Sequence, residues 1–217
     1  MALIGEKEQT QLREIFAQLQ GPVKLVFFTQ EQECQFCRET HQLVEEVAAL
    51  SDRIALEVYD FQADKEQVER YHVDKIPAIA LIGAKDYGVR FYGIPSGYEF
   101  GALVQDLVDV ANGTTELNAK TKAALSTLQE PVHFQVFSTP TCPYCPGMVR
   151  LTHQMAIESD LVTADAIEAI EFPHLSIKYR VQGVPRTLAN ETIVIEGLVP
   201  EGRLVKEVLD GLKRKKG

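Results

Sequence analysis

The residues best suited to chemistry in this 217-residue chain are its four cysteines. They form two Cys-x-x-Cys pairs, Cys34 with Cys37 and Cys142 with Cys145, and equivalent members lie 108 residues apart. Two intervening residues let such a pair close a disulfide, and the free amides of a helix N-terminus stabilise a thiolate. The pattern predicts dithiol–disulfide exchange, with Cys34 and Cys142 as nucleophiles and Cys37 and Cys145 as resolving thiols.

Each cysteine pair follows an apolar stretch with the composition of a β-strand. Residues 23–28 and 132–137 are rich in valine and phenylalanine, and each is short enough to be a single strand. After each pair, apolar residues recur at helical spacing, to about Leu50 in the first case and about Glu158 in the second. We therefore expect both pairs at strand-to-helix junctions, with each helix beginning at the first cysteine.

The surroundings of the two pairs are also repeated. Leu19-Gln20-x-Pro22-Val23 recurs as Leu128-Gln129-x-Pro131-Val132, and Tyr71-x-Val73-x-x-Ile76-Pro77 recurs as Tyr179-x-Val181-x-x-Val184-Pro185. Repeats at this spacing indicate two copies of one folding unit. Turn residues cluster near Asn112-Gly113-Thr114, which predicts one domain over residues 1–113 and another over residues 114–217.

Each copy shows the same predicted order of elements: helix, strand, helix, strand, helix, strand, strand, helix. A strand–helix–strand unit implies a right-handed crossover between parallel strands. The last two strands are separated by a short turn, so we expect them to be antiparallel. The sequence therefore predicts an α/β protein with two tandem folds of one type, each a mixed four-stranded sheet flanked by helices.

Two prolines occupy equivalent positions in the copies. Pro77 and Pro185 each lie 43 residues after the first cysteine of their half, at the start of a predicted strand. Proline removes a backbone donor from a sheet ladder. We interpret both as cis prolines that face the dithiol and leave the backbone of Ile76 or Val184 free to pair with a substrate chain.

These features together resemble a known family. Cys142-Pro143-Tyr144-Cys145 is similar to the glutaredoxin-type motif, and each half resembles a thioredoxin fold. The whole chain resembles the two-domain protein disulfide oxidoreductases of thermophilic archaea and bacteria, through residues 137–146, 168–171, 91–95 and 99–100. This resemblance implies reduction of protein disulfides in the cytoplasm, and their formation or isomerisation. It implies no bound cofactor, electrons from NADPH through a flavin-dependent thioredoxin reductase, and compatibility with a homodimer.

One departure from the thioredoxin pattern concerns proton transfer. Thioredoxins carry a buried acid six residues before the first cysteine, where this chain has Phe28 and Val136. The acid is therefore either absent or supplied from elsewhere, and Glu33 and Glu57 are the candidates nearest in sequence. The acceptor of the resolving cysteine's proton is an open question at this point.

Bulk properties exclude some other classes. A net charge of −9 argues against a nucleic-acid binder, and neither a signal-peptide pattern nor a run of 18 apolar residues occurs. We therefore expect a cytoplasmic protein, in which four cysteines are catalytic or bind metal. Two alternatives stay open: a dedicated electron-donor module for a peroxiredoxin or another reductase, and a four-cysteine zinc site.

Overall fold

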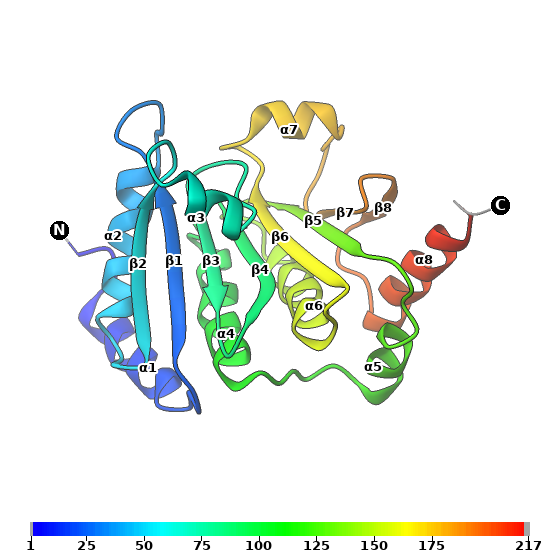
Figure 1. Ribbon diagram of the computed structural model, residues 1–217, viewed down its shortest axis with the longest axis horizontal. Coiled ribbons are helices and arrows are strands. Elements are labelled where there is room, and N and C mark those ends of the chain that lie inside the picture. Colours follow the sequence, from blue (N-terminus) through cyan, green and yellow to red (C-terminus); the bar gives the residue numbers. More distant parts are fainter. Residues whose placement is uncertain (1, 215–217) are drawn as a thin grey trace.

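The computed structural model describes residues 2–214 (Figure 1). In the first half the elements are α1 (Glu6–Phe16), β1 (Val23–Thr29), α2 (Cys37–Ala48), β2 (Ile54–Asp60), α3 (Lys65–Arg70), β3 (Ala78–Ile82), β4 (Asp86–Tyr92) and α4 (Tyr98–Asn112). In the second half they are α5 (Ala119–Leu125), β5 (Val132–Ser138), α6 (Cys145–Glu158), β6 (Val162–Glu168), α7 (Pro173–Lys178), β7 (Arg186–Ala189), β8 (Ile193–Glu196) and α8 (Glu201–Arg214). The predicted order of elements is confirmed in both halves.

The strands form one continuous sheet rather than two separate ones. Its order is β2-β1-β3-β4-β6-β5-β7-β8, so each half contributes four adjacent strands with the predicted mixture of parallel and antiparallel pairs. The halves join where β4 pairs with β6 in parallel, from Val89 opposite Ala164 to Tyr92 opposite Ile167. The sequence analysis did not predict this join.

The strand directions place both cysteine pairs at the same edge of the sheet. β1 is antiparallel to β3 and β3 to β4, whereas β4, β6 and β5 are mutually parallel. β1 and β5 therefore point the same way, and the cysteine pair that follows each strand lies beyond its carboxyl end. With four strand spacings between β1 and β5, the two pairs are roughly 19 Å apart.

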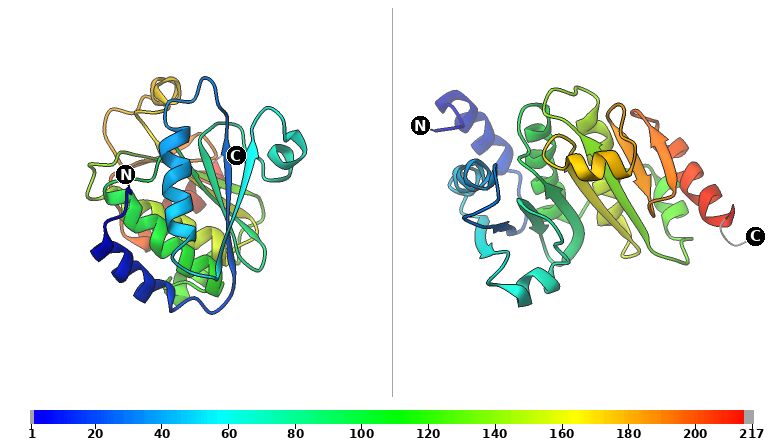
Figure 2. Two further views of the ribbon diagram at one scale, coloured as in Figure 1. Left: turned by 90° about the vertical axis from the view of Figure 1, so that its left-hand side faces the viewer. Right: turned by 90° about the horizontal axis from the view of Figure 1, so that it is seen from above.

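Helices cover the two faces of this sheet unequally (Figures 1 and 2). One face packs against α1, α2, α4, α5, α6 and α8, and its buried apolar cluster includes residues of both halves, from Phe27 and Leu103 to Phe134 and Met148. The other face lies under α3 and α7, with Phe28, Phe137 and Phe172 in its cluster. Strands buried on both faces explain the nearly continuous apolar runs before each cysteine pair.

A buried polar contact also ties the halves together between α4 and α6. His153 Nδ1 lies 2.6 Å from a carboxylate oxygen of Asp106, and both side chains are fully buried. Arg150 and Gln154 of α6 bind Asp109 of α4 at 2.7 and 2.9 Å. Burial raises the pKa of Asp106, while the neighbouring His153 opposes that shift. Within residues 2–214, no helix is long and apolar enough to cross a bilayer.

Candidate redox site

Both cysteine pairs are closed as disulfides, Cys34–Cys37 and Cys142–Cys145, with Cα–Cα distances of 5.4 and 5.5 Å. The helices α2 and α6 begin at the second cysteine of each pair, so the predicted start at the first cysteine was three residues too early. Each first cysteine instead lies just ahead of the helix. The backbone N–H of Cys145 donates toward Cys142 Sγ at 3.1 Å, which supplies the amide stabilisation expected for a thiolate there.

Accessibility differs between the members of each pair. Cys142 is 7% exposed and Cys145 is completely buried, whereas in the first pair Cys34 is half-buried and Cys37 is buried. In both halves the first cysteine is the one that solvent or a partner reaches. This ordering agrees with an attacking thiol outside and a resolving thiol inside.

The two prolines lie beside these pairs with cis peptide bonds, Ile76–Pro77 and Val184–Pro185, as predicted. The carbonyl oxygen of Val184 is 3.7 Å from Cys142 Sγ; since that sulfur is in a disulfide, the contact is a van der Waals one. The carbonyl of Pro77 accepts a hydrogen bond from Gly93 N, and that of Pro185 accepts one from Gly197 N. Ile76 and Val184 are half-buried, so each keeps an accessible part next to the sulfurs.

Neither sequence-based candidate for the missing acid is suitably placed. Glu33 is exposed, in the loop before Cys34. Glu57 lies in the middle of β2, where its carboxylate forms an ion pair with Lys24 at 2.6 Å. The hydrogen bond from Lys24 lowers the pKa of Glu57, so this group is a poor proton acceptor near neutral pH.

A different acid lies beneath the second cysteine pair. The amide of Tyr98, the first residue of α4, donates to the carbonyl of Pro140 at 2.9 Å. The first turn of this helix from the other half therefore lies against the loop that leads to Cys142. There Glu99, only 2% exposed, accepts a hydrogen bond from the hydroxyl of Ser138. Burial raises the pKa of Glu99 to about 7.

Two further carboxyl groups complete a cluster with Glu99 at this edge of the sheet. Glu168 ends β6, and its pKa is raised by burial; Glu171 follows in the next loop, and burial raises its pKa to about 7. The amide of Ile94, from the first half, donates to Glu171 Oε1 at 2.8 Å. No Lys or Arg of residues 2–214 offsets the charge of these three carboxyl groups. Sequence reasoning missed them because they meet only through the β4–β6 join.

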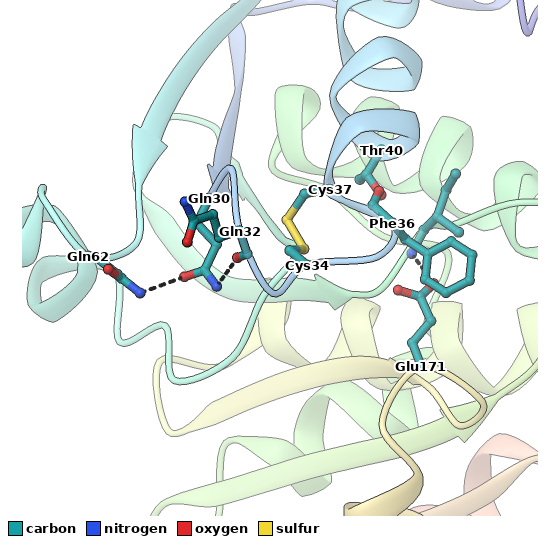
Figure 3. Close-up of a disulfide and its surroundings, with 9 residues drawn as sticks. Gln30, Gln32, Cys34, Phe36, Cys37, Thr40, Gln62 and Glu171 are labelled. Carbon is teal, nitrogen blue, oxygen red and sulfur yellow. Dashed lines mark hydrogen bonds between the residues drawn. A yellow bond between two sulfur atoms is a disulfide. The ribbon is translucent and has the colours of Figure 1, made fainter.

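The surfaces around the two pairs differ in polarity. Near the second pair, Tyr144 is 64% exposed, and the side chain of Leu198 lies over Gly147 of α6 while remaining about half exposed. Beside the first pair, Gln30 donates to the carbonyl of Gln32 and accepts a hydrogen bond from Gln62 (Figure 3). An apolar rim thus surrounds the second site, and a polar loop borders the first.

The arrangement does not support a four-cysteine metal site. The pairs lie four strand spacings apart in the sheet, roughly 19 Å, whereas zinc ligands lie within about 2.3 Å of the metal. In the described range 2–214, no group of three or more His, Cys, Asp or Glu side chains could hold a metal ion. Each pair instead closes on itself.

Comparison with known proteins places this geometry among redox proteins. Residues 132–210 match the family model of the thioredoxin domain. A protein disulfide oxidoreductase from Aeropyrum pernix is 30% identical, with a TM-score of 0.88 over 94% of this chain and 91% of that chain. The structure of a C503A mutant of AhpF, a component of the alkyl hydroperoxide reductase of Enterococcus faecalis, is 26% identical, with a TM-score of 0.86 over 93% of this chain and 97% of that chain.

A curated relative is a protein of the same kind as the second of these structures. The AhpF-type component of the alkyl hydroperoxide reductase of Pseudomonas putida is 29% identical over 162 residues, which are 74% of this chain. The match spans only 29% of that relative's length. The likeness therefore concerns one part of a longer protein.

Proposed function

Because this chain belongs to the two-domain thioredoxin-like proteins, we propose that it is a protein dithiol–disulfide oxidoreductase. It reduces protein disulfides, and also forms or isomerises them, through its two cysteine pairs. The observation that carries this proposal is the repeated arrangement of a closed Cys-x-x-Cys disulfide at a strand-to-helix junction beside a cis proline.

In this proposal Cys142 and Cys34 are the nucleophiles. The Cys142 thiolate attacks one sulfur of a substrate disulfide, forms a mixed disulfide and expels the other substrate sulfur as a thiolate. Cys145 then loses its proton and attacks Cys142 Sγ, which closes the protein disulfide and releases the second substrate thiol. Two electrons pass from the dithiol to the substrate, and Glu99 is placed to accept the proton of Cys145 because it lies beneath this loop.

Substrate chains bind beside the two prolines. We propose that the backbone of Ile76 or Val184 pairs with an extended segment of the substrate, while Pro77 and Pro185 close the ladder on the other side. The contact between Val184 O and Cys142 Sγ places that backbone next to the attacking sulfur. The apolar rim formed by Tyr144 and Leu198 suits unfolded or partly unfolded chains at the second site.

The protein needs no bound cofactor for this exchange, since the disulfides themselves carry the electrons. We propose that electrons come from NADPH through a flavin-dependent thioredoxin reductase, and that the protein works in the cytoplasm, where thiols are kept reduced. Residues 1–113 and 114–217 are the proposed domains, and a homodimer is the proposed assembly. Size-exclusion chromatography with light scattering tests the assembly.

A second candidate function is favoured by the similarity to AhpF of alkyl hydroperoxide reductase. In this alternative the chain is a dedicated electron-donor module for a peroxiredoxin or another reductase. Such a module delivers electrons to one partner, whereas a general oxidoreductase acts on many disulfides. The polar loop beside Cys34 differs from the apolar rim at Cys142, so the two sites can serve different partners.

Insulin-disulfide reduction distinguishes these functions. The wild-type protein is assayed with thioredoxin reductase plus NADPH, with glutathione, and with dithiothreitol as electron donors. A general oxidoreductase reduces insulin with at least one donor and loses that activity in the Cys34→Ser/Cys142→Ser double variant. No insulin reduction, together with rapid reduction of a peroxiredoxin, would favour the electron-donor module.

A further inference from the structure

The first cysteine pair has no acid from its own half beneath it, because Phe28 occupies the position before it. A carboxyl group of the other half lies beside this pair instead. Figure 3 shows Glu171 with its carboxyl group directed toward the segment that joins Cys34 to Cys37, next to Phe36. We infer that Glu171, from the second half, exchanges the proton of Cys37 during turnover of the first dithiol. This inference rests on the proposed function and adds a residue to its first site.

The carboxyl group of Glu171 is held in place from both halves. The amide of Ile94 donates to Oε1 at 2.8 Å, and the backbone N–H of Glu171 donates to the Glu168 carboxylate at 2.5 Å. The second oxygen, Oε2, is buried and has no hydrogen-bond partner in the described part of the chain. A fixed carboxyl group with one unengaged oxygen has the capacity to take up a proton and return it.

The repeat supplies an internal comparison for this contact. Gly93 and Gly197 are equivalent residues, and each donates to the carbonyl of its cis proline at 2.9 or 2.8 Å. A Cβ atom at Gly93 would lie 2.6 Å from Glu168 Cβ and 3.0 Å from Glu171 Oε1, whereas nothing lies within 4 Å of one at Gly197. The carboxyl groups are therefore built specifically against the first cysteine pair. The second pair has Glu99 from the first half, so each half supplies the acid for the other's dithiol.

The charges around Glu171 favour a titration near neutral pH. The groups that face it are the carboxyl groups of Glu168, at the end of β6, and Glu99, on α4, together with the thiols of its target dithiol. Burial and the negative charge of Glu168 both raise the pKa of Glu171, to about 7. A group with this pKa is efficient as a proton acceptor and as a donor at neutral pH.

The proposed step conserves atoms and electrons. After Cys34 forms a mixed disulfide with the substrate, Cys37 gives its proton to the Glu171 carboxylate and attacks Cys34 Sγ. The bond between Cys34 and the substrate sulfur breaks, and the substrate leaves as a thiolate. Glu171 then returns its proton to that thiolate, so the substrate disulfide is reduced by two electrons and the Cys34–Cys37 pair is oxidised.

The test uses the full chain with Cys142→Ser and Cys145→Ser, so only the first dithiol reacts. The reduced protein is mixed with Ellman's reagent, a small disulfide, in a stopped-flow instrument; attack by Cys34 releases the first nitrothiobenzoate and attack by Cys37 the second. We expect Glu171→Gln to slow the second release about 100-fold near pH 7. The wild-type rate should rise with pH through about 7, as Glu171 ionises, and this rise should be lost in the variant.

Three comparisons make the result decisive. Glu171→Asp keeps an acid and should retain at least about a tenth of the rate, while the exposed Glu69→Gln on α3 should leave it within twofold. With Cys34→Ser and Cys37→Ser instead, so that only the second dithiol reacts, the effect of Glu171→Gln should be at least tenfold smaller. Equal slowing of both dithiols, or an Asp variant as slow as the Gln variant, would mean a packing role and overturn the inference. A second release within twofold of wild type in Glu171→Gln would also overturn it. Because Ellman's reagent replaces the protein substrate, these outcomes are independent of whether insulin is reduced.

Discussion

Alanine at Gly93 should destabilise the protein more than alanine at the equivalent Gly197. Both glycines have a positive φ, 91° and 73°, so an alanine costs about 1 kcal/mol of backbone strain at either site. Only at Gly93 does the new methyl group meet other atoms, Glu168 Cβ at 2.6 Å and the Glu171 carboxyl group at 3.0–3.1 Å. Overpacking of this kind adds about 1–3 kcal/mol.

The expected totals are therefore about 1 kcal/mol for Gly197→Ala and about 2–4 kcal/mol for Gly93→Ala. For a protein of this size each kcal/mol lowers Tm by about 2–4 °C. Thermal and urea unfolding of the oxidised proteins measure the difference, and Gly197→Ala controls for backbone strain. Equal losses in the two variants would show that the carboxyl groups at the join move aside easily, and would refute the reasoning that they are held rigidly.

Three other perturbations test separate parts of the structure. Cys142→Ser should reduce insulin reduction more than Cys34→Ser, because the second pair has the glutaredoxin-type motif and the apolar rim; equal losses contradict this. His153→Ala should lower the free energy of unfolding by about 3–5 kcal/mol, since it leaves the Asp106 carboxyl group buried without its partner; a loss below about 1 kcal/mol in urea unfolding argues against that contact. Glu99 has a pKa of about 7 when folded against an ordinary 4.5, so it binds its proton more tightly in the folded state. Wild-type stability should fall by up to about 3 kcal/mol from pH 5 to pH 8, and Glu99→Gln should flatten this fall; an unchanged slope contradicts the assignment.

Local sequence patterns predicted the elements and the redox residues because those depend on neighbours in the chain. The Cys142–Cys145 pair, for example, was predictable from a strand before it, a helix after it and a proline 43 residues beyond Cys142. The start of each helix was less predictable. Cys34 and Cys142 precede the first helical turn, a difference of three residues that periodicity alone does not resolve.

The join and the carboxyl cluster were not predictable because they depend on contacts between distant residues. Ile94 and Glu171 are 77 residues apart and lie on different halves. One signal was present in the repeat: the counterpart of Glu171 in the first half is Ala63, so this acid is not part of the shared pattern. An acid found in one copy only was a reason to look for a role outside its own copy.

The pairing of β4 with β6 also has a consequence for aggregation. Two separate four-stranded sheets would expose four edge strands, each a template for pairing with another chain. The join uses two of these edges and leaves only β2 and β8 at the ends of the sheet. A protein that handles unfolded chains with unpaired strands benefits from having few such templates of its own. Either half expressed alone would regain an exposed edge, and we expect it to be the less soluble form.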